Sequence, residues 1–375
     1  MLLQLTSDQE FLRETTARFL DELAPVERLR ELRGHEQGFE ADYWRRGAEL
    51  GWTSLLVGED HGGGSVSGSG LVDLTLLAHE FGRHAAPGPL VPTNVVAGAL
   101  SAGSAHLDLL AGLLDGSAVA TWCLAEPHGR FGRVDLAVRV DGDELVLDGV
   151  KRPVESAGAA THLLVTGRTG DGLTQVVVPT DTTGVTITPL VGVDLTRRFS
   201  TVRFDGVRVP AAAVLGQVGK ADEDVERQLQ HALVILDAES VGAMEAAFEM
   251  TVEWSFDRYS FGRPLASYQA LKHRFADMKT WLEGAHAIAD ESAEAVAAGR
   301  PDAAVLASAA KAFIGEYGSE LVQDCVQMHG GIGVTFEHDV HLFLRRHTVD
   351  RALYGTPSEH RLRIVDLTEQ QEGAS

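Results

Sequence analysis

The chain has very little cysteine, few basic residues and no long apolar run. Cys123 and Cys325 are its only cysteines in 375 residues, which excludes a disulfide framework. Lys plus Arg total 32 against 54 Asp plus Glu, a net charge of −22, so general binding to nucleic acid or anionic lipid is disfavoured. Because it also shows no signal-peptide pattern and no apolar stretch of about 18 residues, we expect a cytoplasmic protein that binds neither nucleic acid nor membrane.

The composition is that of a folded protein with more than one unit. Apolar residues make up 44% of the chain, enough for a large core, and a single core rarely grows past about 250–300 residues. Residues 1–116 have helical periodicity, which begins at a capping-box spacing from Ser7 to Glu10. Residues 117–217 consist of short β-type runs, and residues 218–375 return to long amphipathic helices.

This order predicts an α+β fold with an N-terminal helical domain, a central antiparallel β-domain and a C-terminal helical bundle. Within the β-block, "VRVDGDELVL" indicates a hairpin that turns at residues 141–143. In the last block, apolar residues recur at three- and four-residue steps from Val225 to Val252 and again from Leu271 to Leu282. Long helices of this kind pack as a bundle.

Three glycines interrupt the helical pattern in "QMHGGIGVTFEHD". Gly330, Gly331 and Gly333 remove every side chain from one bend, which allows positive φ and a close approach by another group. One interpretation is a helix C-terminal cap followed by a turn. The other is a cradle in which exposed N–H groups bind an anion.

A second element, "DRYSFGRPLASYQALKHRFADM", lies between two predicted helices. Arg258 offers a planar fork of donors, and Gln269 opens the next helix, where N-terminal N–H groups favour an anion. An Arg at a helix end often only caps carbonyl groups. Two such elements in one bundle are harder to explain as unrelated turns.

With these elements the chain resembles the acyl-CoA dehydrogenase family over essentially its whole length. The pattern Arg-x-x-Phe-Gly-x-x-Ile/Leu-x-x-x-Gln and the pattern Gln-x-x-Gly-Gly-x-Gly are both present. The resemblance implies FAD as cofactor, with these elements reaching the adenosine and pyrophosphate part of a flavin seated mainly on a neighbouring subunit. The residues implied in cofactor binding are Arg258, Ser260, Phe261, Gln269, Gln327, Gly330, Gly331, Gly333 and Thr356.

The catalytic glutamate that the resemblance implies is missing. Relatives remove the α-proton of an acyl-CoA with a glutamate, commonly within Tyr-Glu-Gly-Thr, while flavin N5 takes a hydride from Cβ. Here Tyr354 is followed directly by Gly355. The alternative slot, counted back from Arg258, falls near Ala232. The nearest titratable residues are His231, Asp237 and Glu239, of which His231 and Asp237 are weak candidates for the base; for each, a surface position on a helix is the simpler interpretation.

The elements that would face this chain's own flavin ring also depart from the family pattern. Leu124-Ala125-Glu126-Pro127 replaces Leu-Thr-Glu-Pro, the following Gly-Ser-Asp is absent, and Pro153-Val154-Glu155 stands where Trp-Ile-Thr is usual. This asymmetry favours the glutamate-lacking subunit of the heterotetrameric acyl-CoA dehydrogenases found among actinobacterial sterol-degrading enzymes. The partners implied are an acyl-CoA substrate, a related subunit in an α2β2 tetramer, and electron-transfer flavoprotein or a similar electron acceptor.

Two rival functions remain open. A flavin-dependent monooxygenase of the same fold also dispenses with the glutamate, and would require an external reductase. A structural or regulatory chain that has lost FAD would not need Arg258, Gln269 and the glycines to keep their spacing. Copurification of yellow flavin with the chain, alone and with its partner, would separate the three.

Two further clusters carry less weight. Arg197 and Arg198 follow "VDLT", where either a contact to a CoA phosphate or, preferably, a solvated loop is expected. His338, His341 and His347 lack a third well-placed ligand at metal-site spacing. We therefore expect no metal site.

Overall fold

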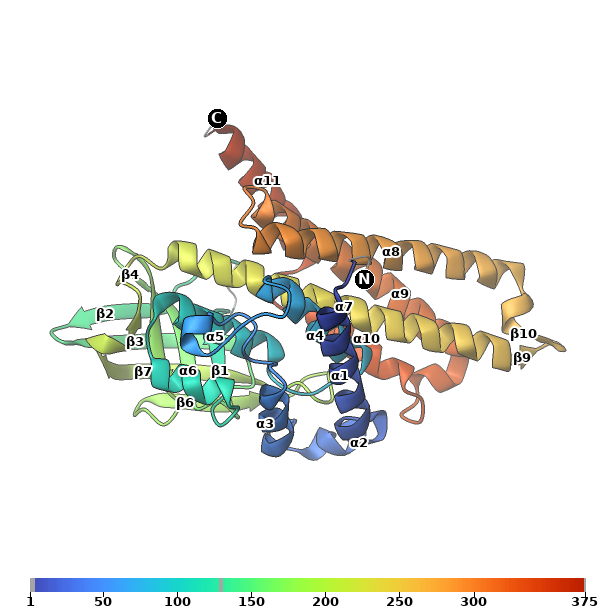
Figure 1. Cartoon of the computed structure of the whole chain (residues 1–375), viewed down its shortest axis with the longest axis horizontal. Coiled ribbons are helices and arrows are strands. Elements are labelled where there is room, and N and C mark those ends of the chain that lie inside the picture. Colours follow the sequence, from blue (N-terminus) through green and yellow to red (C-terminus); the bar gives the residue numbers. More distant parts are fainter. Residues whose placement is uncertain (1–3, 128–130, 374–375) are drawn as a thin grey trace.

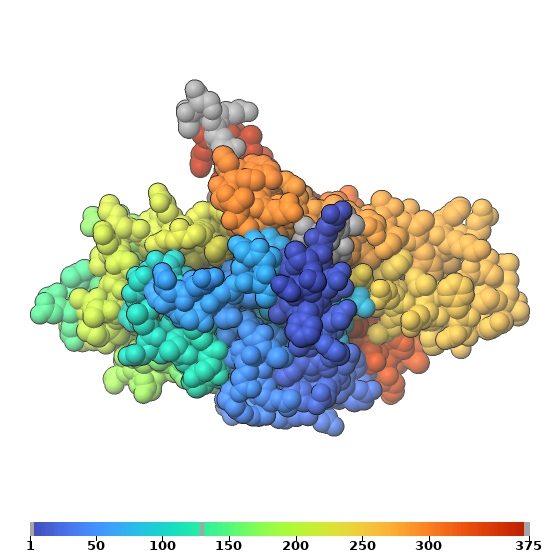
Figure 2. Space-filling view, viewed as in Figure 1, coloured from blue at the N-terminus to red at the C-terminus, as the bar shows by residue number. Residues whose placement is uncertain are grey.

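The computed structural model of the chain describes residues 4–127 and 131–373. Figure 1 shows the β-domain at one end of the long axis of the molecule and the N-terminal helices beside the middle of the molecule. Two long helices, α7 and α8, extend away from the β-domain to the opposite end, where a small hairpin forms the tip. In the space-filling view of Figure 2 the tip, in yellow and orange, lies clear of the N-terminal helices in blue.

The N-terminal block is helical, as predicted. Its helices are α1 (Ser7–Leu23), α2 (Val26–Glu31), α3 (Ala41–Glu49), α4 (Gly70–Arg83), α5 (Leu90–Gly103) and α6 (Leu107–Leu114), with short 3-10 turns at Leu32–Gly34 and Glu59–His61. The capping box lies one residue earlier than predicted, because Thr6 and Gln9 exchange the two capping hydrogen bonds. Trp52 is fully buried and packs edge-on against Phe81 of α4, at 4.7 Å between ring centroids.

The central block forms one sheet in the order β6-β7-β3-β2-β4-β5-β8, with β1 paired to β4. Its strands are β1 (Ala120–Cys123), β2 (Ala137–Asp141), β3 (Glu144–Glu155), β4 (His162–Thr169), β5 (Gly172–Pro179), β6 (Val185–Leu190), β7 (Phe199–Pro210) and β8 (Val214–Leu215), with a 3-10 turn at Ala211–Ala213. The predicted hairpin is confirmed, since Asp141 pairs with Glu144. The prediction of a purely antiparallel domain was wrong, because β1 and the start of β2 run parallel to β4. A parallel pair needs a long connection, and the β2–β3 hairpin with its flanking segments provides one.

The C-terminal block is a bundle of long helices. It contains α7 (Asp222–Asp257), the hairpin β9 (Tyr259–Ser260) and β10 (Arg263–Pro264), α8 (Gln269–Ala297), α9 (Ala303–His329), α10 (Val340–Ala352) and α11 (Pro357–Gly373), with 3-10 turns at Leu265–Ser267 and Gly330–Val334. Helix α7 joins the bundle to the N-terminal block by a close crossing with α4. A Cβ on Gly82 would lie 1.8 Å from the Glu239 carbonyl oxygen, and one on Gly242 would lie 2.0 Å from that of His79. Only glycine permits this approach.

Among the described residues, no helix is both long enough and apolar enough to cross a membrane. The helical N-terminal block ends with α6 and the strands begin with β1; the strands end with β8 and the helices resume with α7. The domain boundaries at 116 and 217 remain a prediction.

Candidate functional site

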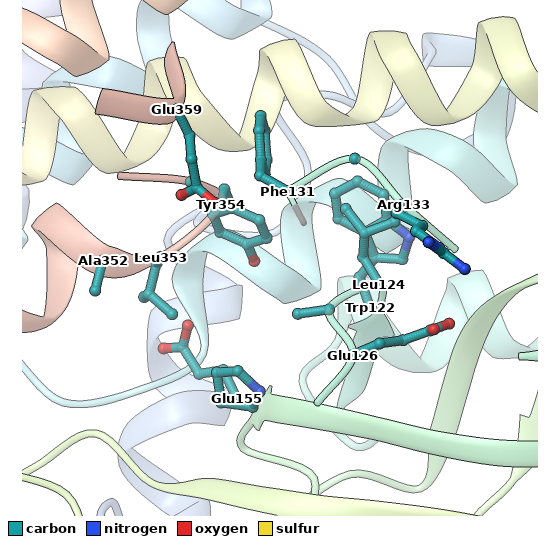
Figure 3. Close-up of a pocket in the computed structure, with 14 residues that line it drawn as sticks. Trp122, Leu124, Glu126, Phe131, Arg133, Glu155, Ala352, Leu353, Tyr354 and Glu359 are labelled. Carbon is teal, nitrogen blue, oxygen red and sulfur yellow. The ribbon is translucent and has the colours of Figure 1, made fainter. Parts of the chain in front are cut away.

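A cavity of about 170 Å³ lies where the β-domain meets the segment after α10. Figure 3 shows its walls: Trp122 of β1, the residues that follow it, and the Leu353–Tyr354 segment on the other side. Trp122 and Tyr354 are stacked, with ring centroids 5.9 Å apart and an interplanar angle of 23°. The described lining residues are Trp122, Leu124, Ala125, Glu126, Phe131, Gly132, Arg133, Pro153, Glu155, Ala352, Leu353, Tyr354, Gly355 and Glu359.

The segment after α10 brings no carboxylate to the position where relatives carry the glutamate. Tyr354 and Gly355 line the cavity one after the other. Gly355 has φ 104°, and a Cβ there would lie 2.7 Å from His360 Nε2, so a larger residue in this place would be strained. The alternative slot, Ala232, is fully buried in α7 and is not among the lining residues.

The structure does not bring the two weak candidates for the base into this cavity. His231 lies on a second cleft of about 280 Å³, between α5 and the start of α7. Burial and the nearby Arg227 lower the pKa of His231 to about 4. Asp237 is buried inside the bundle, where burial raises its pKa to about 7, partly offset by Lys311. A base must reach its proton directly or through one water, and neither His231 nor Asp237 is among the residues that line this cavity.

Glu126 lines the cavity, but its carboxylate is committed to the protein's own backbone. It accepts hydrogen bonds from the Asp135 N–H at 2.8 Å and the Leu136 N–H at 2.9 Å. The buried Lys151 Nζ donates to the same carboxylate at 2.6 Å and to the Leu124 carbonyl at 3.0 Å. The segment that faces the flavin in relatives is thus held by internal bonds in this chain.

Residues 194–197, just before β7, are buried, and Arg197 lies in an ionic cluster, contrary to both interpretations of this arginine. Arg197 is 5% exposed and pairs with Asp350 at 2.9 Å, with Glu239, and at 3.5 Å with Glu155. Arg198 donates to backbone carbonyl groups, including Leu195 at 2.9 Å. The Arg197 guanidinium is held by buried acids, and the guanidinium of the partly exposed Arg198 also donates to the Leu32 and His35 carbonyl groups, so neither is free for a phosphate.

Arg346 of α10 is the second cation of this cluster. Its Nε donates to Asp194 at 2.6 Å and its Nη1 to Glu239 at 2.6 Å. Its remaining nitrogen, Nη2, donates to the carbonyl groups of Ala85 and Ala86, each at 3.0 Å, and to the Thr196 hydroxyl at 2.8 Å. One fully buried side chain therefore ties together all three blocks of the chain.

Glu155 is a residue whose place in the site the sequence did not reveal. It ends β3, lines the cavity and is 5% exposed, yet neither carboxyl oxygen has a hydrogen-bond partner among the described residues. Burial raises the pKa of Glu155, and Arg197 only partly opposes this shift. The one signal in the sequence was its position in Pro153-Val154-Glu155, where relatives usually have Trp-Ile-Thr.

The residues implied in cofactor binding divide between two places. Arg258 follows α7 directly, and its carbonyl accepts the Leu265 N–H at 2.9 Å, which closes the β9–β10 turn. Ser260 and Arg263 pair across that turn, and Phe261 at its tip is 98% exposed. Gln269 is the first residue of α8 and is exposed. All of these lie at the end of the bundle opposite the β-domain (Figure 1).

The glycine cluster lies at the same end and serves two purposes within the chain. Gly330 is the C-cap of α9 with φ 66°, as the capping interpretation predicts. Gly333 is buried, and a Cβ there would lie 2.6 Å from the Val326 carbonyl oxygen. Gly331 has no atom within 4 Å of an added Cβ and no positive φ. Nothing among the described residues requires glycine at 331. Gln327, in the last turn of α9, is exposed.

The two motif elements are held together by aromatic contacts. Trp254, one turn before Arg258, stacks on His329 at 5.3 Å between ring centroids, and His329 immediately precedes Gly330. His338 packs on both rings, at 4.2 Å from His329 and 5.8 Å from Trp254. The structure therefore brings the arginine turn and the glycine turn side by side.

Thr356 lies apart from the other residues implied in cofactor binding. It follows the Tyr354–Gly355 segment at the start of α11. Its hydroxyl donates to Glu359 Oε2 at 2.8 Å, and its N–H donates to the same oxygen at 2.8 Å. This pattern caps the helix, so the local role of Thr356 is structural.

The three histidines considered for a metal do not converge. His347 is buried with its Nδ1 2.7 Å from the Ser240 hydroxyl, while His338 accepts the Val340 N–H at 3.1 Å. Among the described residues the one group with suitable spacing is a different set, made of His79, Glu245 and His286. Arg83 occupies the Glu245 carboxylate at 3.1 Å, which disfavours a cation there.

Comparison with known proteins decides the family. Sequence models of the acyl-CoA dehydrogenase N-terminal and C-terminal domains match residues 6–107 and 223–366. The chain is 30% identical to the acyl-CoA dehydrogenase IpdE2 of Mycolicibacterium smegmatis, over 96% of this chain and 98% of that protein. The chain belongs to the acyl-CoA dehydrogenase family. The resemblance noted in the sequence is thereby confirmed.

Solved structures agree with this assignment. A variant of the Tcur3481–Tcur3483 steroid ACAD superposes with a TM-score of 0.89 at 29% identity, covering 98% of this chain and 99% of that one. The ChsE4–ChsE5 complex from Mycobacterium tuberculosis gives a TM-score of 0.87 at 23% identity, covering 98% of both chains. At that identity the second likeness speaks for the fold alone. The predicted order of helical domain, β-domain and helical bundle is confirmed.

Proposed function

We propose that this chain is the subunit without a catalytic glutamate in a heteromeric, FAD-dependent acyl-CoA dehydrogenase. FAD, when bound, supplies the hydride acceptor for α,β-desaturation of an acyl-CoA thioester. This chain contributes the arginine turn and the glycine turn to a flavin seated mainly on a related subunit, which supplies the base. The observation that carries the proposal is the separation of the intact motif residues from a cavity with no carboxylate at either position where relatives carry the catalytic glutamate.

The donor set at the far end suits a pyrophosphate. Arg258 and Gln269 are exposed there, and an arginine fork binds phosphate oxygens bidentately. The start of α8 adds free N–H groups that favour an anion. Gly331 leaves its backbone uncovered, as a cofactor that approaches from outside the chain requires. The neighbouring Phe261 and Val334 are 98% and 74% exposed, which suits burial by a second subunit.

The chain's own cavity is a poor place for the flavin ring. Ala125 offers no hydroxyl, and the Glu126 carboxylate is already occupied by two backbone N–H groups and Lys151. This segment therefore offers the polar edge of the ring neither a hydroxyl donor at 125 nor a free carboxylate acceptor at 126. One flavin shared between two different subunits explains both the loss here and the retention at the far end.

The related proteins support the finer parts of the proposal. The superposed structure at 29% identity is named the Tcur3481–Tcur3483 steroid ACAD, a name that joins two proteins. We infer an α2β2 tetramer, an acyl-CoA whose acyl group is a sterol side chain, and electron-transfer flavoprotein or a similar acceptor as partners of this chain. Purification with the co-expressed partner and measurement of flavin per chain would test the stoichiometry, and one flavin per single chain would contradict sharing.

Substitution of Arg258 tests the cofactor contact. Arg258→Ala in the complex should lower the affinity for FAD about tenfold or more, since a hydrogen bond to a charged group contributes about 1.5–3 kcal/mol. The matched control is Arg263→Ala, which removes one positive charge from the same turn, where the Arg263 guanidinium lies over the Tyr268 ring at 3.8 Å. Flavin retention is measured by fluorescence during dilution at limiting FAD. If the Arg258→Ala and Arg263→Ala complexes retained FAD equally well, the assignment of Arg258 would be contradicted.

The glycine turn gives a second comparison. Gly331→Ala should leave the stability of the chain unchanged but weaken FAD retention in the complex, because the added methyl group enters only open space in this chain. Gly333→Ala should lower the free energy of unfolding by about 1–3 kcal/mol, since its Cβ collides with backbone. Thermal unfolding of the chain alone and flavin fluorescence of the complex separate the two effects. Normal flavin retention by Gly331→Ala would argue against a cofactor at this turn.

A further inference from the structure

The cavity beside Tyr354 has the size of a single ring. Its described walls enclose about 170 Å³, and a protein cavity of about 150 Å³ holds one benzene molecule. The three fused rings of a flavin need more space than this, so the cavity in its present shape suits a smaller ring than the family's cofactor. The walls are largely apolar and aromatic, with Trp122, Leu124, Phe131 and Leu353 among them.

One polar group stands out in these walls. In Figure 3 the Glu155 carboxyl points toward Leu353 and Tyr354, whereas the Glu126 carboxylate points to the other side. Both Glu155 oxygens are buried without a hydrogen-bond partner among the described residues. Arg197 Nε lies 3.5 Å from Glu155 Oε1, and the two other guanidinium nitrogens of Arg197 donate hydrogen bonds to Glu239 and Asp350. An unpartnered polar group at such a place is costly unless a ligand satisfies it.

The ionic cluster behind Glu155 has too few cations to ionise all its acids. All its members are less than 10% exposed. The five acids are Glu155, Asp194, Asp237, Glu239 and Asp350, and the three cations are Arg197, Lys311 and Arg346. The acids outnumber the cations by two, which favours protonated acids in this cluster. Burial raises the pKa of Asp350 to about 8 and that of Asp237 to about 7, and it also raises the pKa of Glu155.

The charged groups that face Glu155 come from three packed segments, and burial among them favours the protonated, neutral form of its carboxyl group. Burial has the largest effect and raises the Glu155 pKa. Arg197, from the segment before β7, and Arg346, from α10, lower that pKa, whereas Glu239, from α7, and Asp194, from the segment before β7, raise it. A neutral carboxyl group has an O–H donor.

We propose that this cavity is a binding site for a small neutral single-ring compound bearing a carbonyl oxygen, and that Glu155 donates its O–H to that oxygen. The ring lies against Trp122, Leu124 and Phe131, while the carbonyl group points to the floor formed by Glu155. No bond is made or broken. The site belongs to this chain by itself and does not depend on the shared-flavin arrangement.

Two fluorinated probes test the site on the full chain by ¹⁹F NMR titration. 4-Fluoroacetophenone carries the ring and the carbonyl group, whereas fluorobenzene carries the ring alone. The native chain should bind the ketone about two- to tenfold more tightly than fluorobenzene, the range given by one net hydrogen bond. This preference should be present at mildly acidic pH, where Glu155 is neutral, and be lost at alkaline pH, where the carboxylate has no donor.

Variants distinguish Glu155 from the other groups. Glu155→Gln keeps a donor at every pH, so its preference for the ketone should not depend on pH; Glu155→Leu should bind both probes equally. Tyr354→Phe should keep the preference. Loss of the preference in Tyr354→Phe with retention in Glu155→Leu would overturn the proposal, as would binding of neither probe. Competition by lumiflavin, a bare flavin ring, would also overturn it, because the cavity would then be a flavin site.

Discussion

Arg346→Met should destabilise the chain severely, and by more than Gly333→Ala. The Arg346 side chain is 1% exposed and is bonded to Asp194 and Glu239. Removing one partner of a buried ion pair typically lowers the free energy of unfolding by about 3–5 kcal/mol, because the stranded charges stay buried. Methionine fills much of the volume, so the loss reports charge rather than a cavity. Urea denaturation followed by circular dichroism measures it.

Two controls make this result specific. Arg300→Met also removes two ion pairs, to Glu291 and Asp302, but the Arg300 side chain is 40% exposed, so its urea midpoint should match the native chain. Glu239→Gln in the Arg346→Met background should recover part of the lost stability, since it removes one buried negative charge from a cluster that has lost a cation, while Arg197 keeps its other acidic partner Asp350. A native midpoint for Arg346→Met would mean that the cluster contributes nothing net. Failure of the double variant to recover would place the loss in the contacts to Ala85 and Ala86 instead.

The sequence predicted elements but not the contacts that join them. Helices and strands follow from local periodicity, as in the stripe of α1 and the Gly142-Asp143 turn, which neighbouring residues alone determine. The parallel pairing of β1 with β4 was missed because the register between distant strands leaves no local signal. The ionic cluster was missed for the same reason. Arg197 pairs with residues 42 and 153 positions away, and in isolation "TRRF" has the composition of a solvated loop.

The candidate site shows the same division. The arginine and glycine turns are short local patterns, and the structure places both at one end of the bundle, joined by Trp254 and His329. His231 and Asp237 were named only by their distance along the chain from an expected slot, which does not specify the face of a helix. Glu155 was noted as a departure from a pattern. Its orientation into the cavity depends on β3, α10 and the Arg197 pairing together.

The isolated chain should show almost no acyl-CoA dehydrogenation, and the complex should show much more. A positioned general base contributes about 10²- to 10⁴-fold to a rate, and neither Ala232 nor the Tyr354–Gly355 segment provides one. The chain alone, supplied with excess FAD, is assayed with an artificial electron acceptor and acyl-CoAs from short chains to sterol side chains. The same assay is run on the complex with the co-expressed partner.

Three variants of the isolated chain show where a base would lie if this expectation failed. Turnover by the chain alone that disappears in His231→Ala or Asp237→Ala would overturn the shared-site proposal and assign the base to the bundle. Turnover that disappears in Glu155→Gln would assign it to the cavity, since the amide keeps the shape and the donor but cannot accept a proton. Turnover that requires O₂ and a reductase would favour the monooxygenase. Activity that appears only in the complex, and survives all three substitutions there, would place the base on the partner, because each of these side chains would then be dispensable for proton removal.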